Sequence, residues 1–198
     1  DDVAWEIAEV KKGERTRKPP LPLTTSTLQK EAAKTLNFST TKTMRIAQQL
    51  YEGIDISGEG TVGVITYLRT DSTRIAVEAD TAARNFIRDE YGEDAVGAFG
   101  SENVNKNAQD AHEAIRPTDI NRTPESIKSS LSREQFMLYR LIYNRFVASQ
   151  MAPAVYQTLT AEVSGKQIGL RFYGKHKMFP GFTTLYEESV DENVDSVE

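Results

Sequence analysis

The pattern of hydrophobic residues changes character twice along the chain, and this limits the fold more than any other feature. An extended pattern is predicted for residues 3–10, and mostly helical spacing follows over residues 24–151. Two strands are then predicted at residues 155–163 and 167–173. Ser164-Gly165-Lys166 between the last two segments is typical of a hairpin turn. Because strand-like segments lie at both ends, we expect an α+β fold in which a helical domain is inserted into a β-strand domain.

The domain boundaries follow from the residues at the first change. Residues 11–18 read as a basic, turn-rich link, and Pro19-Pro20-Leu21-Pro22 then forms a stiff, non-helical connector. We therefore assign residues 1–23 and 152–198 to a discontinuous β domain. Residues 24–151 form the helical domain.

Composition limits the class of protein. Of the 198 residues, 38% are hydrophobic and 27% are charged, as in ordinary soluble domains. No apolar run approaches the roughly 20 residues that cross a bilayer, so we expect no membrane contact. The absence of cysteine excludes disulfides and thiolate metal sites and fits a cytoplasmic protein. The chain begins with Asp1 and has no signal peptide, so we expect a piece of a longer protein.

The net charge of −5 is concentrated in an acidic tail that starts at about residue 187. This tail holds six acids and no base, and we interpret it as a solvated end. The remainder is nearly neutral, so charge neither supports nor excludes a nucleic-acid partner. An interaction domain without nucleic-acid contact therefore stays open as one alternative.

Two short helices are predicted at the start of the helical region. Thr24-Thr25-Ser26-Thr27 offers N-caps for a helix that ends at Leu36, and Asn37 is a typical left-handed stop. The second helix carries apolar residues at helical spacing, namely Met44, Ala47, Leu50 or Tyr51, and Ile54. The pair has the form of a helix-turn-helix (CAP-like) unit, although many such pairs are simply core. A non-catalytic DNA-binding module is therefore a second alternative.

A later helix is better specified. Ser132 and Gln135 fit a capping box, and aromatic residues recur on one face of the helix that follows. These are Phe136, Tyr139, Tyr143 and Phe146. We expect them to form core rather than to stack on bases.

The segment that carries chemistry is residues 60–74. Val62 to Leu68 reads as a short buried strand, and the Thr-Asp-Ser-Thr run after Arg69 is able to cap a helix from about residue 74 to residue 91. If Tyr67 and Arg69 are extended, their side chains share one face. A guanidinium stabilises a phenolate and holds a phosphate oxygen, and a nearby helix N-terminus attracts an anion. These residues alone leave phosphotyrosyl chemistry and ordinary packing both open.

A second cluster spans residues 109–118. If it is helical as far as Arg116, His112 and Arg116 share one face and form a phosphate clamp, and Pro117 ends the turn. A helix C-terminus decorated with cations is the simpler alternative. A zinc site is not expected, because Arg116 stands where a second histidine would be needed.

Three motifs in the same order resemble those of type IA DNA topoisomerases. The run from Ile65 to Thr73 is similar to the active-site signature, and Ala111 to Thr118 resembles the second hallmark in its bacterial topoisomerase I form. Residues 20–29 resemble the start of the same domain. Leu68 stands where many relatives have Met, a conservative difference. The chain thus resembles the central fragment of a bacterial type IA topoisomerase.

The resemblance implies a role for each matching residue. Tyr67 attacks single-stranded DNA to form a 5′-phosphotyrosine, and Arg69 orients Tyr67 and stabilises the phosphoryl oxygens. The implied DNA-binding residues are His112, Arg116, Asp71 and Ser72. The helical domain is then the gate and the β domain its arch. A second strand passes through the gate, which relaxes negatively supercoiled DNA.

The resemblance also implies what lies outside the chain. In the family, Mg²⁺ is bound by a Toprim domain, which has no counterpart here, so we expect no metal or cofactor within this chain. The fragment alone is then expected to neither cleave nor relax DNA. Its partners are DNA and the Toprim and remaining domains of the same parent chain. We expect a monomer associated with the nucleoid.

Overall fold

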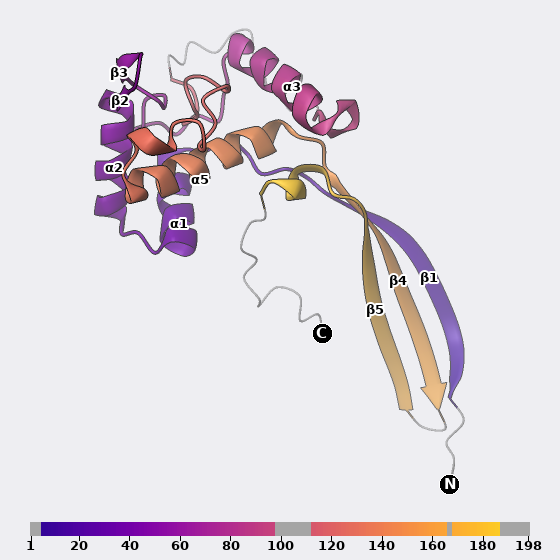
Figure 1. Cartoon of the computed structure of the whole chain (residues 1–198). Coiled ribbons are helices and arrows are strands. Elements are labelled where there is room, and N and C mark those ends of the chain that lie inside the picture. The colour runs from indigo at the N-terminus through magenta and orange to yellow at the C-terminus, as the bar shows by residue number, and fades with distance from the viewer. Residues whose placement is uncertain (1–4, 98–111, 166–167, 187–198) are drawn as a thin grey trace.

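The computed structural model describes residues 5–97, 112–165 and 168–186, and it consists of a helical body from which a long β ribbon projects (Figure 1). The acidic tail and the first three residues of the cluster at 109–118 lie outside the described residues. Within the described part, no helix combines the length and the apolar character needed to cross a membrane.

The ribbon is a three-stranded antiparallel sheet in the order β1-β4-β5. Strand β1 (Glu6–Arg17) precedes the helices, whereas β4 (Ala154–Gly165) and β5 (Ile168–Phe179) follow them. The predicted pairing of the two late segments is therefore confirmed. So is the prediction that both ends of the chain supply strands to one sheet.

The prediction of a turn-rich link at residues 11–18 is wrong, because Lys11 to Arg17 continue β1 and pair with residues 160–154. These residues are exposed or half-buried, so the strand does not need the apolar pattern that marks a buried strand. Hydrogen bonds to β4 satisfy the backbone instead. The domain division itself remains a prediction.

The two faces of the ribbon differ in polarity. On one face, Ile7 lies across from Val163, which pairs with Leu170. The next row on that face is Val10, Ala161 and Phe172. On the opposite face, Arg171 pairs with Glu162 at 2.6 Å. Ile7, Val10, Leu170 and Phe172 are all between 43% and 66% exposed, so this apolar face is uncovered among the described residues.

The helical body begins with the predicted pair. In α1 (Thr25–Leu36), Thr24 forms the N-cap in a capping box with Thr27, and Asn37 ends the helix at φ 54°. In α2 (Thr40–Glu52), Ser39 is the N-cap. Both helices and the left-handed stop are therefore confirmed, but α2 ends at Glu52, so Ile54, which was assigned to it, lies in the strand that follows.

Helix α5 (Arg133–Gln150) is the axis on which the body packs, and it contacts α1, α2 and α3 (Val77–Tyr91). The predicted Ser132–Gln135 capping box is present. Three of the four predicted aromatic core residues are buried, and Phe136 is half-buried. The core prediction for this helix is thus confirmed.

Buried Arg145 of α5 joins distant parts of the chain. Its Nε donates to the carbonyl oxygen of Leu21 in the proline-rich connector at 2.7 Å, and its Nη1 donates to the Tyr186 hydroxyl at 3.1 Å. The Tyr186 hydroxyl donates to Glu31 of α1 at 2.8 Å. The short turn Gly181–Thr184 therefore returns the chain from the ribbon to the helical core.

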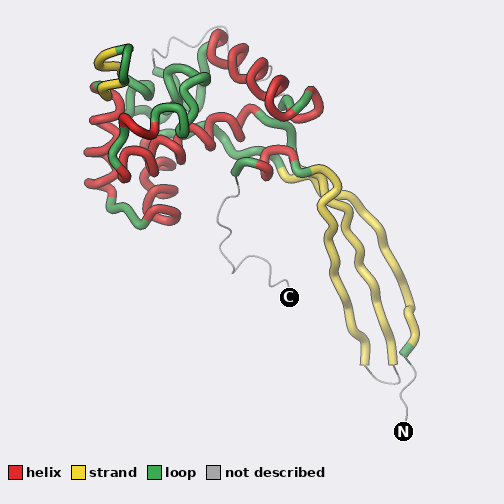
Figure 2. Tube along the Cα trace, in the orientation of Figure 1, coloured by secondary structure: helices red, strands yellow, loops and turns green. Residues whose placement is uncertain are grey.

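The segment between α2 and α3 differs from the prediction. A small hairpin of β2 (Ile54–Ile56) and β3 (Gly60–Val62) follows α2, so the strand expected from Val62 to Leu68 is largely absent. Figure 2 shows mostly loop between this hairpin and α3. Helix α3 begins at Val77, and its N-cap Ala76 has no side-chain cap, so the Thr-Asp-Ser-Thr run does not cap it. The predicted end at Tyr91 is confirmed.

Candidate active site

Tyr67 lies on a loop whose neighbouring residues are anchored on both sides. Val64, Ile65 and Leu68 are buried, whereas Tyr67 is 41% exposed. The Thr66 hydroxyl donates to the carbonyl oxygen of Ala114 at 2.7 Å, and the Leu68 carbonyl accepts from the Thr25 hydroxyl at 2.8 Å. The buried neighbours and these side-chain bonds hold the loop, so that the tyrosine projects from a fixed backbone.

Two aromatic side chains contact Tyr67. The Tyr51 ring lies 5.5 Å from the Tyr67 ring, centroid to centroid, at 67° in an edge-to-face contact. The imidazole of His112 lies 5.7 Å from the same ring at 31°. The structure therefore brings together Tyr67 and His112, which the two sequence motifs had singled out separately. Tyr51 was predicted only as a packing position on its helix.

An open pocket of about 450 Å³ lies beside His112, and three separate segments line it. Its lining residues are Thr25, Ser26 and Gln29 of α1, then Arg69, Thr70 and Asp71, and finally His112. The first turn of α1 has no acidic residue, and the positive end of the helix dipole favours an anion there. Together with the guanidinium of Arg69, this lining suits a phosphate group.

Backbone bonds fasten α1 to the loop after Arg69. The Thr25 N–H donates to the Thr70 carbonyl at 2.9 Å, and the Thr70 N–H donates to the Thr25 hydroxyl at 2.9 Å. Thr25 was predicted only as a cap, and its spacing from Thr70 gives no sequence indication of this contact. Ser72 does not line the pocket, and its hydroxyl accepts from the Arg74 N–H at 3.2 Å within a local turn.

Arg116 has a different environment from His112. The expected helix up to Arg116 is wrong, because residues 112–116 are not helical and Ile115 instead bridges Leu23. Arg116 Nε and Nη2 donate to the two carboxylate oxygens of Glu113 at 3.0 and 2.8 Å. Its side chain is 11% exposed and does not line the pocket. The predicted contact between Arg116 and DNA stays a prediction.

Glu113 was not singled out from the sequence, and no local pattern indicates its bond to Ala76, 37 positions away. Its carboxylate accepts from the backbone N–H of Ala76 at 3.0 Å as well as from Arg116. The same carboxylate thus supplies the acceptor that α3 lacks at its start. These bonds also fix the position of Glu113 itself, which directly follows His112 in the sequence.

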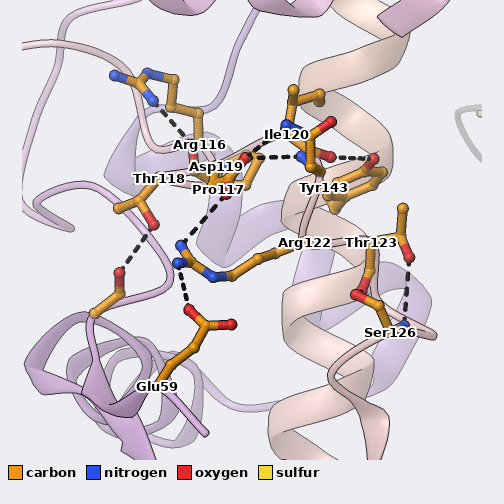
Figure 3. Close-up of polar contacts among 12 residues, drawn as sticks. Glu59, Arg116, Pro117, Thr118, Asp119, Ile120, Arg122, Thr123, Ser126 and Tyr143 are labelled. Atoms are coloured by element: carbon orange, nitrogen blue, oxygen red, sulfur yellow. Dashed lines mark hydrogen bonds and ion pairs between the residues drawn. The ribbon is translucent and has the colours of Figure 1, made fainter. Parts of the chain in front are cut away.

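The chain after Arg116 is fixed by a second polar network (Figure 3). Arg122 donates to Glu59 at 2.7 Å and lies 3.8 Å from Asp119. The Tyr143 hydroxyl donates to the Ile120 carbonyl at 2.7 Å. Burial raises the pKa of Tyr143, so this phenol stays protonated and serves as a donor. Among the described residues, no group of three or more His, Cys, Asp or Glu side chains forms a candidate metal site.

Comparisons with known proteins identify the family of this chain. The sequence model of the family described as DNA topoisomerase matches residues 2–197. The chain is similar to full-length topoisomerase I from Thermotoga maritima, with 38% sequence identity and a TM-score of 0.83. The similarity covers 98% of this chain and 31% of that protein, so the chain spans about a third of its length. The chain belongs to the type IA DNA topoisomerase family.

Proposed function

We propose that this chain is the tyrosine-bearing part of a longer type IA topoisomerase, and that Tyr67 is its nucleophile. One observation carries the proposal: Tyr67 is the half-exposed tyrosine that contacts His112, beside a pocket suited to a phosphate. The buried tyrosines of α5 are unsuited to this role, because burial raises the pKa of Tyr139 and of Tyr143. Both of these phenols also donate to backbone carbonyls.

In the proposed reaction, the Tyr67 oxygen attacks the phosphorus of a phosphodiester in single-stranded DNA. A bond forms between the Tyr67 oxygen and the 5′-phosphate as the phenol loses its proton, the bond to the 3′ oxygen breaks, and that oxygen takes up one proton and leaves as a hydroxyl. Arg69 and His112 hold the phosphoryl oxygens from the pocket, and Asp71 orients the donors. Religation is the reverse step, so the bond energy is conserved and strand passage relaxes supercoils without ATP.

The Mg²⁺ ion of the reaction is assigned to the Toprim domain of the longer protein. Asp71 is the acidic residue of the pocket, and a single carboxylate is not the ligand set of a dedicated metal site. The residues present therefore do not fit the ion. For this reason we propose that the chain by itself neither cleaves nor relaxes DNA.

The β ribbon is proposed to be the arch and the helical body the gate that it carries. The uncovered apolar face of the ribbon supports packing against further domains, because monomeric proteins rarely leave such a face in water. The alternative of a helix-turn-helix module has less support. Lys42 and Arg45 of α2 both pair with Glu134, which partly neutralises the face that would meet a duplex.

Covalent trapping on the longer protein tests the proposal. The protein is incubated with Mg²⁺ and a single-stranded oligonucleotide, quenched with denaturant and run on a denaturing gel. A label at the 3′ end should shift to protein size, whereas a label at the 5′ end should appear on a shortened, unattached strand. Tyr67→Phe should abolish both products, and Tyr91→Phe should retain both, because Tyr91 is similarly exposed but lies at the end of α3. An adduct that persists in Tyr67→Phe would remove Tyr67 as the nucleophile.

A further inference from the structure

Tyr51 is a half-exposed aromatic residue for which the helical core gives no reason. It is the penultimate residue of α2, and its neighbour Leu50 is fully buried, whereas Tyr51 is 39% exposed. Its described ring contact is with Tyr67, which is itself 41% exposed. Two large rings that are both partly in water therefore lie against each other at the surface.

The backbone brings these two rings together. The Val64 N–H donates to the Leu50 carbonyl at 2.9 Å, which ties the loop that carries Tyr67 to the last turn of α2. A Cβ atom on Gly63 would lie 2.6 Å from the carbonyl oxygen of Tyr51. Only glycine allows this approach, so residue 63 sets how closely the end of α2 meets the Tyr67 loop.

The contact with Tyr51 bears on the χ1 conformation of the Tyr67 side chain. A tyrosine on a loop has three staggered χ1 wells, and a surface side chain exchanges among them quickly. A nucleophile has to meet the reacting phosphorus in one direction, so time spent in the other wells lowers the rate. Edge-to-face pairs with centroids about 4.5–7 Å apart are favourable, and the 5.5 Å contact lies within that range.

We propose that Tyr51 is a positioning residue that holds the Tyr67 ring in its attacking orientation. The proposal rests on the proposed function of Tyr67. His112 also contacts the ring, but it lines the phosphate pocket, whereas Tyr51 does not line it. Tyr51 therefore acts on the ring of the nucleophile rather than on the DNA. What it contributes is its aromatic ring and not its hydroxyl.

The test compares Tyr51→Leu, Tyr51→Phe and Tyr91→Leu in the longer protein. Tyr91 is a matched control: it ends α3 and is 37% exposed, and no ring contact is found for it among the described residues. Single-turnover adduct formation is measured with saturating oligonucleotide, and oligonucleotide binding is measured separately. Tyr51→Leu should slow adduct formation by about 2- to 12-fold, the value of one aromatic pair. Its binding constant should change by less than about twofold, a smaller change than that in rate.

Tyr51→Phe retains the ring and should react at the wild-type rate, as should Tyr91→Leu. Equal rates in Tyr51→Leu and Tyr91→Leu would overturn the proposal. Weaker oligonucleotide binding with an unchanged rate at saturation would overturn it too, because Tyr51 would then contact the DNA. A loss in Tyr51→Phe equal to that in Tyr51→Leu would assign the effect to the hydroxyl and would also refute it.

A second measurement separates this inference from the proposed function. The ring-proton resonances of Tyr67 in this chain, assigned with Tyr67→Phe, should shift in Tyr51→Leu and not in Tyr91→Leu, because a neighbouring ring shifts them. If wild type forms no adduct but the shift occurs, the ring contact stands and the proposed function fails. If wild type forms the adduct and the Tyr67 resonances do not shift in Tyr51→Leu, the positioning role of Tyr51 is refuted and the proposed function of Tyr67 stands.

Discussion

Glu113 links the start of α3 to Arg116, and replacing it with alanine tests how the segment beside Tyr67 is held. The change removes both carboxylate bonds from the guanidinium of Arg116, whose side chain is 11% exposed, and leaves its bond to the Pro117 carbonyl. Hydrogen bonds to a charged group contribute about 1.5–3 kcal/mol. Loss of the acceptor for the Ala76 N–H adds about 1 kcal/mol, as for a lost N-cap. We expect Glu113→Ala to lower the free energy of unfolding by about 3 kcal/mol.

Urea and thermal unfolding of this chain measure the effect. For a domain of this size about 3 kcal/mol corresponds to a fall in Tm of roughly 6–12 °C. Glu125→Ala is the matched control, because Glu125 and Lys128 have the same spacing but side chains that are 66% and 60% exposed. That change should cost about 0–1 kcal/mol. Equal losses in the two variants would refute the view that the Glu113 bond is structural.

Two further predictions concern charges elsewhere in the body. Hydrogen bonding to Lys42 lowers the pKa of Glu134, so its contribution to stability is present above the ordinary glutamate pKa and is lost as pH falls through the lowered value. The stability difference between wild type and Glu134→Gln, from urea unfolding, should therefore be larger at about pH 6 than at about pH 3. Arg145→Met should lower the free energy of unfolding by about 2–3 kcal/mol, because it leaves the Leu21 carbonyl without its donor. Arg140→Met, at an exposed position, should lower it by less than about 0.5 kcal/mol in the same assay.

The elements whose signals are local were predictable from the sequence. Asn37 ends α1 in the left-handed conformation, and Ser132 with Gln135 caps α5, because a cap depends on residues only three or four positions away. Helix α3 shows the limit of such signals. A suitable run of polar residues preceded it, yet the acceptor at its start is Glu113, 37 positions away from Ala76. No local pattern encodes a contact at that distance.

The candidate site was predictable in its residue types but not in its arrangement. Tyr67 and Arg69 were singled out because a phenol and a guanidinium together suit phosphate chemistry. The expected strand and helix around the two motifs are loops, since the buried residues there are fastened by bonds between distant segments. For the same reason Arg116 was expected beside His112, whereas its guanidinium is held by Glu113 and does not line the pocket.

This arrangement explains how loops are able to hold a nucleophile in place. Three segments far apart in the sequence meet at Tyr67, and each is bonded to the others through its backbone. The Thr66 N–H donates to the Arg116 carbonyl at 2.9 Å, the Ile115 N–H donates to the Leu23 carbonyl at 2.8 Å, and the Thr25 N–H donates to the Thr70 carbonyl. A shift of one segment therefore breaks bonds to both others, so the three form a single unit. The contact between Tyr67 and His112 therefore depends on bonds that join distant parts of the chain.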